Sequence, residues 1–273
     1  MYGQRVVAFA LGLLSYSSGG ALFAQERLPH LKVSAKTPCL VHPEAALETA
    51  ELWLAARDAL QAVTGAGPEV PRLLVQEWRR TLDQAFRLRW ERRDTTSLTT
   101  RHPWEKPLPG NLERAGYIQQ QGWSTVYYGP DAGLLVSEWF LRRHCFSRIA
   151  GSGATHGLSG LAFEPVPATG RTDVTGVLWV DLPRNELRRV EYRWTDPPAA
   201  ARAPGIGGQA DFVRLSSGGW IIQRWNIRMP RPIEELSGAI DGYTDQGGEV
   251  LAVLDGRIVG RSDRRTGGRA AGR

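Results

Sequence analysis

The sequence predicts an α+β fold, in which a long antiparallel β-meander forms a curved sheet or half-barrel and one N-terminal amphipathic helix packs on it. Apolar residues follow a helical period between Pro43 and Val63. From Arg72 onward they alternate with polar residues, and groups of Gly, Pro, Asn and Ser separate the alternating runs. No internal repeat interrupts this order, so we expect a single domain over residues 25–256.

The first 24 residues are expected to be a secretory signal peptide. Arg5 precedes an apolar run from Val6 to Leu14, a Ser/Gly segment follows, and the stretch ends at Ala24. A membrane anchor and an ordinary buried helix are the alternatives, but a spanning helix needs roughly 20 apolar residues. We therefore expect an exported protein, periplasmic or outer-membrane-associated, with no transmembrane segment in the mature chain.

The positive charge of the chain lies at its ends. Of the formal net charge of +6, five charges come from residues 257–273 and the sixth from Arg5, so residues 25–256 are formally neutral. A nucleic-acid-binding protein would carry its basic excess on the folded body, so nucleic acid is not an expected partner. The Arg/Gly-rich tail at 257–273 is expected to be disordered, and alternatively it contacts phosphate, lipid headgroups or an acidic partner.

The two cysteines, Cys39 and Cys145, are expected to form one disulfide, because exported proteins favour pairing over free thiols. Such a bridge would close a loop of about 100 residues and contribute roughly 4 to 5 kcal/mol by the chain-entropy model. The alternatives are unreactive buried thiols and a nucleophilic Cys145 beside His144. The last is weak, since neighbouring residues on a strand point to opposite faces.

The helix is predicted over residues 43–63. Pro43 suits a first helical position, and Gly65 stands where a C-terminal cap belongs. The predicted buried stripe consists of Ala46, Ala50, Trp53, Arg57 and Leu60, with Leu47 and Leu54 beside it.

The strands are predicted from alternation and turn residues. Phe86, Leu88 and Trp90 are expected on one buried face. Three hairpins follow along the chain. They are Val174–Asp181 with Leu187–Trp194, Ala210–Leu215 with Trp220–Met229, and Ala239–Thr244 with Glu249–Leu254, which turn at residues 182–185, 216–219 and 245–248.

Three segments do not follow the strand pattern. Residues 94–116 are expected to be a polar loop, and residues 195–209 a mobile connection. A short helix is expected around Ser137 to Arg143.

No stretch carries a catalytic or metal-binding signature. Gly157 to Leu161 lacks the final glycine of a serine-hydrolase elbow, and the five histidines show no metal-ligand spacing. No catalytic residue, metal or cofactor is therefore assigned. For a hydrolase whose site assembles only in three dimensions, the least implausible residues are Ser159, His156 and either Glu164 or Asp181.

Tryptophan and arginine alternate along several strands, which favours core tryptophans on one face and charged ladders on the other. The alternative is a concave sheet face that accepts an apolar ligand or a partner segment. The residues expected to form that face are Trp179, Tyr192, Trp194 and Trp225, with Arg224 and Arg228 at the rim.

Several short sequence segments of the chain, taken together, resemble those of a group of exported bacterial proteins labelled carboxypeptidase-like regulatory-domain proteins. The resemblance spans most of residues 38–255 and implies export without implying peptidase activity, because the label describes an immunoglobulin-like domain for which this chain has no room. The strand-turn-strand segments are also similar to LolA-type periplasmic lipoprotein carriers, which implies a half-barrel around an apolar cavity. The segments are Cys39 with Pro43-Glu44 and Leu52-Trp53, Gly116–Ile118, Tyr127–Ala132, His144–Phe146, Gly157–Pro165, Gly176–Asp181, Trp220–Ile222 and Arg228–Pro230.

These observations favour an exported, non-enzymatic binding or assembly module of the bacterial cell envelope, with an apolar ligand or an envelope protein as its partner. A hydrolase and a purely structural envelope domain are the alternatives. Enzymatic activity and oligomeric state stay open.

Overall fold

The computed structural model describes residues 43–64, 70–100, 109–122, 124–166, 171–195, 202, 205–232 and 239–254. The predicted signal peptide, Cys39 and the predicted tail lie outside the described residues. Among the described helices, none combines the length and the hydropathy that a membrane crossing requires.

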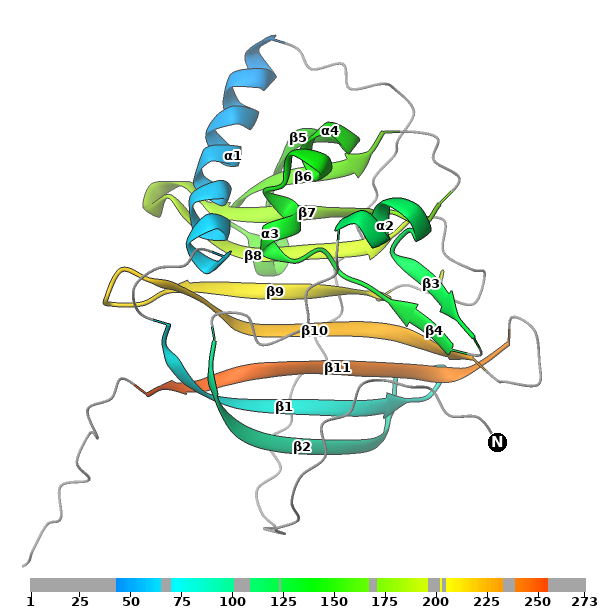
Figure 1. Cartoon of the computed structure of the whole chain (residues 1–273). Coiled ribbons are helices and arrows are strands. Elements are labelled where there is room, and N and C mark those ends of the chain that lie inside the picture. Colours follow the sequence, from blue (N-terminus) through cyan, green and yellow to red (C-terminus); the bar gives the residue numbers. More distant parts are fainter. Residues whose placement is uncertain are drawn as a thin grey trace, which may run out of the picture.

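Nine antiparallel strands form one open sheet, in the order β2-β1-β11-β10-β9-β8-β7-β6-β5 (Figure 1). From β5 to β11 each strand pairs with the next in the chain, and the hairpin β1–β2 is then added to β11. The strands are β1 (Arg72–Leu82), β2 (Leu88–Thr99), β5 (His144–Ala150), β6 (Ser159–Pro165), β7 (Val174–Asp181), β8 (Glu186–Trp194), β9 (Gly207–Arg214), β10 (Trp220–Pro232) and β11 (Ile240–Val253).

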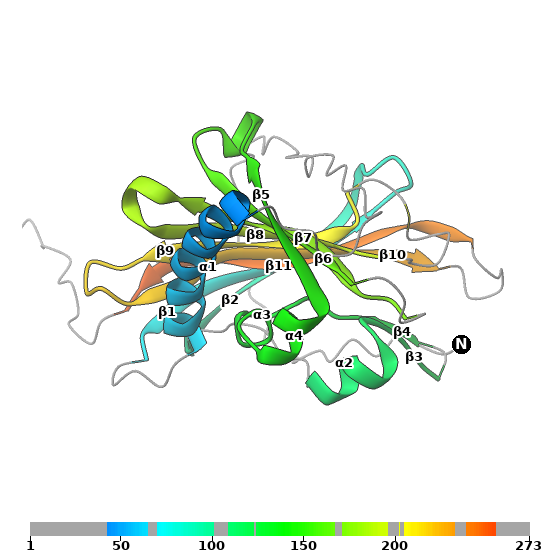
Figure 2. The same cartoon turned by 90° about the horizontal axis from the view of Figure 1, so that it is seen from above.

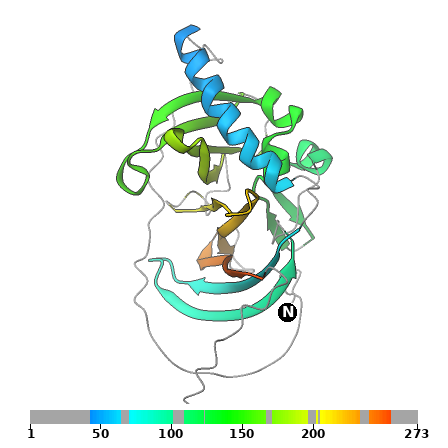
Figure 3. The same cartoon turned by 90° about the vertical axis from the view of Figure 1, so that its left-hand side faces the viewer.

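The helices and a small ribbon lie on one side of this sheet (Figure 2). We call the side that faces helix α1 the inner face and the opposite side the outer face. Figure 3 shows β1 and β2 as arcs below α1, so the sheet is curved, and the predicted α+β meander is confirmed. The remaining elements are α1 (Pro43–Thr64), α2 (Pro109–Ala115), β3 (Ile118–Gln121), β4 (Ser124–Tyr127), α3 (Ala132–Leu135) and α4 (Glu138–Arg143).

Helix α1 has the predicted bounds but buries a different stripe. It packs mainly against β5 to β8 and reaches β10. Leu47 and Leu54 are exposed, as is Ala50, and Trp53 lies at the border, 5.8 Å from the ring of Phe146. Of the predicted stripe, Leu60 is buried, and Trp53 and Arg57 are partly buried. Alanines, which let a helix approach a sheet closely, occupy half of the observed contact. The buried residues are Leu52, Ala55, Ala56, Ala59, Leu60 and Val63.

The hairpin β7–β8 is confirmed, and so is its turn, where Asn185 takes the left-handed conformation with φ of 54°. The hairpin β9–β10 is also confirmed. A bulge between Ile222 and Arg224 places Ile222, and not Ile221, on the face of Trp225. The predicted short helix over residues 137–143 is present as α4, with the Ser137 side chain accepting a hydrogen bond from the Phe140 N–H.

The predicted third hairpin is wrong, because residues 240–253 form one continuous strand, β11, between β10 and β1. Leu88 and Trp90, predicted to be buried, are half exposed on the edge strand. Phe86 precedes them in the β1–β2 turn with a φ of 61°. The predicted loop at 94–116 instead contains the end of β2 and helix α2, and β9 already begins within the predicted connection.

Candidate functional site

The structure divides the six predicted ligand-face residues between the two faces of the sheet. Cross-strand partners share a face, and Tyr192 and Trp225 belong to the face on which α1 packs. Trp194 lies on that inner face too. Trp179, Arg224 and Arg228 point to the outer face.

The inner-face aromatic residues are part of the core. Trp194 is 5% exposed, and its indole N–H donates to the Tyr128 carbonyl at 2.7 Å while Tyr127 packs on its ring. The Tyr192 ring fills the space over Gly129 and Gly208, where a Cβ atom would meet its hydroxyl. Burial raises the pKa of Tyr127 to about 12 and that of Tyr192 further. These buried aromatic rings therefore have a structural role in the core.

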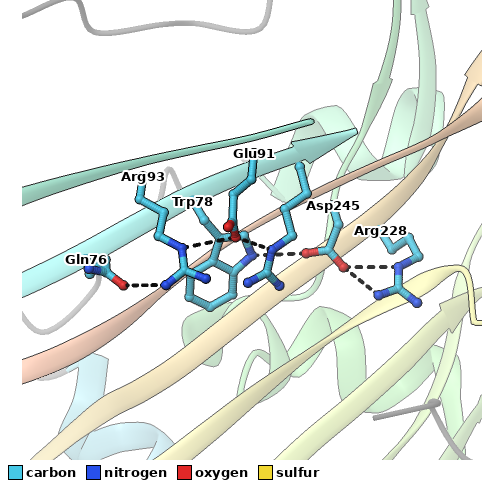
Figure 4. A network of polar contacts seen from close by, with 7 residues as sticks. Gln76, Trp78, Glu91, Arg93, Arg228 and Asp245 are labelled. Atoms are coloured by element: carbon cyan, nitrogen blue, oxygen red, sulfur yellow. Dashed lines mark hydrogen bonds and ion pairs between the residues drawn. The ribbon is translucent and has the colours of Figure 1, made fainter. Parts of the chain in front are cut away.

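On the outer face, a buried carboxylate joins a tryptophan to an arginine (Figure 4). Asp245 on β11 is 2% exposed and accepts the indole N–H of Trp78 at 3.0 Å. Its other oxygen accepts two N–H groups of Arg228, at 3.0 and 2.7 Å. The carboxylate is therefore fully engaged, and the predicted turn residue Asp245 is a cross-strand anchor.

A row of charged side chains continues this cluster toward the edge of the sheet. The Glu91 carboxylate accepts from Arg80 at 2.6 Å and lies 3.1 Å from Arg93, whose guanidinium also reaches Gln76. The guanidinium groups of Arg80 and Arg224 lie 5.0 and 5.7 Å from the Trp78 ring centre. Arginines thus cover the tryptophan, which offers no bare aromatic plane.

A second cluster of the same kind lies on the outer face of β7, β8 and β9. Trp179 donates its indole N–H to Glu191 at 3.2 Å, and Arg189 bridges Glu191 and Asp211. Burial raises the pKa of Glu191, while the hydrogen bond from Trp179 and the charge of Arg189 oppose that rise. Both clusters satisfy their own polar groups, which is the pattern of a structural ladder.

Two successive glycines let the sheet carry tryptophan on both faces. A Cβ atom at Gly247 would lie 2.6 Å from the Trp78 ring on the outer face. A Cβ atom at Gly248 would lie 2.3 Å from the Trp225 ring on the inner face. Both glycines are therefore needed because a tryptophan ring packs closely against the strand, and they do not form a turn.

Three polar side chains on the inner face have no partner in the described part of the chain. They are Glu77 and Arg79 on β1 and Gln246 on β11, which pairs directly with Arg79. The Gln246 amide nitrogen is buried without a hydrogen bond. Burial, together with the charge of Asp94, raises the pKa of Glu77. We call these three residues the inner polar set.

An apolar wall borders the inner polar set. Ile227 on β10 pairs with Gln246, and Trp225 and Met229 flank it on the same strand and face. Ile227 and Met229 are half-buried. None of the three residues of the inner polar set was predicted from the sequence to be a site residue. Alternation alone places Arg79 on the face opposite Trp78, and that signal was available.

The residues proposed for a hydrolase do not come together. Ser159 begins β6, exposed His156 lies before it, and Glu164 ends the same strand. The Asp181 carboxylate is held by Arg184 and Arg188. No hydrogen bond joins any of these four side chains to another, and the described residues contain no cluster of three or more potential metal ligands.

Cys145 lies on β5, and the described residues contain no free thiol. Its predicted partner Cys39 lies outside the described residues, so the disulfide stays a prediction.

His144, next to Cys145, is buried, and its two ring nitrogens lie at hydrogen-bonding distance from the carbonyls of Phe140 and Val174. The His144 ring also contacts the Asp173 carboxylate at 3.2 Å. His144 therefore has a packing role.

Comparisons with known proteins do not assign the chain to a family. No protein-family model, no curated protein sequence and no solved structure matches it.

Proposed function

We propose that the protein is an exported, non-enzymatic binding module of the bacterial cell envelope that holds an amphiphilic ligand on the inner face of β10, β11 and β1. The ligand would have an apolar body and a polar end with acceptor oxygens. The observation that supports this most directly is the inner polar set, which has no partner among the described residues and lies beside a half-buried apolar wall.

The energetics of the inner polar set favour an occupant. A buried amide nitrogen without a hydrogen bond costs about 1 to 3 kcal/mol, and Gln246 carries such a nitrogen. Arg79 next to it adds a positive charge and further donors. A ligand oxygen placed between Gln246 and Arg79 would satisfy both donors.

The apolar wall supports the other half of the proposal. Ligand sites combine hydrophobic lining with a few polar groups that fix the orientation of the ligand. Ile227 and Met229 are partly buried against the core and adjoin the polar set. Helix α1 makes its larger contacts with β5 to β8 and β10, so β11 and β1 are the less covered strands of the inner face. The expected signal peptide and the similarity to LolA-type carriers support the envelope location.

The proposal can be tested by titrating the mature protein with a fluorescent long-chain fatty acid. We expect saturable binding, and Arg79→Gln should weaken it at least ten-fold because a hydrogen bond to a charged group is lost. Arg92→Gln is the matched control. It lies opposite Arg79 on the same face, but it is exposed and paired with Asp94.

Two outcomes would contradict the proposal. One is a folded protein that binds no fatty acid, which would favour the purely structural envelope domain. The other is equal binding by the Arg79→Gln and Arg92→Gln variants, which would move the ligand away from the inner polar set. Native mass spectrometry of protein purified from its own envelope fraction would identify a co-purifying ligand.

A further inference from the structure

Strand β2 forms a long edge of the sheet, and no other described strand pairs with its outer side. β2 spans Leu88–Thr99, pairs only with β1 within the described residues, and is exposed along nearly its whole length. Its pairing with β1 runs without interruption from Arg72 and Thr99 to Thr81 and Trp90. A strand of this regularity presents backbone N–H and C=O groups on alternate residues, which is a template for another strand.

The opposite edge, β5, differs in each of these respects. It has 7 residues against 12 in β2, and α1 packs against it. Phe146 on β5 contacts Trp53 of α1, and Arg148 forms an ion pair with Glu48 of the same helix. Among the described elements, a helix therefore packs against the β5 edge, whereas none covers the β2 edge.

The charge around β2 indicates what can add to it. The hairpin from Arg72 to Thr99 holds seven arginines and four acidic residues, although residues 25–256 as a whole are formally neutral. Glu91 and Asp94 are already paired with Arg80, Arg93 and Arg92. The Arg89 and Arg92 side chains are 65% and 54% exposed, and each contacts one carboxylate, of Asp83 at 2.9 Å and of Asp94 at 2.8 Å, which leaves part of each guanidinium facing solvent. An incoming strand with acidic residues would complement this surface.

A second copy of the chain is a poor occupant. A symmetric antiparallel pair places one residue of β2 directly opposite its own copy. For the two registers of longest overlap along Leu88–Thr99, that residue is Arg93 or Asp94. Each of these choices sets identical charges against each other, which is destabilising.

We propose that β2 is a docking site for an extended acidic segment of a partner protein, which adds as a tenth strand to the sheet. Main-chain hydrogen bonds to β2 supply the affinity, and the arginines along the strand select acidic residues at alternate positions. The site lies at the sheet edge and adjoins the inner polar set, because Arg92 pairs with Arg79 across β1 and β2.

The probe is a 12-residue peptide in which glutamate alternates with valine and threonine. Binding is measured by calorimetry and by amide hydrogen exchange of the mature protein. We expect protection of alternate amides in β2, and about ten-fold weaker binding by an Arg89→Glu/Arg92→Glu variant. Arg142→Glu is the control, because Arg142 is an exposed arginine on α4, away from this edge.

Peptides N-methylated at alternate positions separate strand addition from charge attraction alone. Only one of the two methylation frames removes the N–H groups that face β2, so one frame should abolish binding and the other retain it. Equal effects of both frames, unchanged exchange in β2, or equal affinity for a lysine peptide would overturn the proposal. Protection of β2 that increases with protein concentration and without peptide would show self-association instead.

Discussion

The half of the sheet under α1 and the half that ends in β1 and β2 use the same alternation of side chains but differ in what lies over their inner faces. Under α1, Leu161, Phe163 and Leu178 are fully buried among apolar neighbours. On β10 and β11, Ile227 is half-buried and Gln246 has an unsatisfied amide. The alternation of side chains along each strand therefore determines which residues share a face of the sheet. Packing of α1 determines which part of that face becomes core.

The outer faces of the two halves are alike. Each carries a tryptophan whose indole N–H donates to a buried carboxylate, with an arginine on the same carboxylate. The structural difference between the two halves therefore lies on the inner face and at the β2 edge.

The largest difference in stability between the two halves is expected when an inner-face side chain of each half is truncated to alanine. Phe163→Ala should lower the free energy of unfolding by about 3 to 5 kcal/mol, because Phe163 is fully buried against Phe140. Ile227→Ala should lower it by only about 1 kcal/mol, because the side chain is half-buried. Urea unfolding of both variants measures the difference. Equal losses would mean that the two inner faces are equally well covered.

The sequence predicted local structure well and long-range pairing poorly. The turn after β7 was recognised because Leu182-Pro183-Arg184-Asn185 carries its own conformational preferences. Residues 245–248 show a similar composition, yet they lie in the middle of β11. Their glycines are needed by Trp78 and Trp225, and the first of these is far away in the sequence. A local pattern does not contain that requirement.

The candidate site was predictable in part for the same reason. Alternation alone places Arg224 and Arg228 on the face opposite Trp225, and the register agrees, so these arginines do not form the rim predicted for that face. Alternation did not place Trp179 relative to Trp225, because that depends on the register across β8 and β9. The inner polar set forms only when β1 joins β11, a pairing that links the two ends of the described chain.

The second prediction concerns the outer-face anchor. Asp245→Asn should lower the free energy of unfolding by about 2 to 3 kcal/mol, since the variant keeps an acceptor for Trp78 but leaves the Arg228 guanidinium without its carboxylate. Asp241→Asn is the control, because its ion pair with Arg231 is more exposed and should contribute less than 1 kcal/mol. A similar loss in both variants would argue against Asp245 as an anchor.

A smaller loss of stability is expected when Gly248 in β11 is enlarged to alanine. Gly248→Ala should cost about 1 to 2 kcal/mol, because the new methyl group overlaps the Trp225 ring. Gly219→Ala, whose Cβ atom would meet only the Ser217 hydroxyl at 3.8 Å, should be nearly neutral. The double variant Gly248→Ala/Trp225→Leu should lose less than the sum of the single variants. Strict additivity in thermal unfolding would mean that the ring does not limit this position.

The smallest effect is expected on the pH dependence of stability, and it comes from Glu77 in the half of the sheet that ends in β1 and β2. Burial and the charge of Asp94 raise the pKa of Glu77 above its reference value of 4.5. The folded state therefore binds this proton more tightly than the unfolded state, and the contribution to stability is complete below pH 4.5 and falls as the pH rises through the folded pKa.

Glu77→Gln removes that titration, so its melting temperature should fall less than that of the parent protein as the pH is raised from 4.5. Asp94→Asn should flatten the curve only partly, because burial, the larger cause, remains. Parallel curves for Glu77→Gln and the parent would show that Glu77 is solvated. A bound amphiphile would sharpen the comparison, since covering Glu77 further would steepen the curve of the parent protein and leave that of Glu77→Gln unchanged.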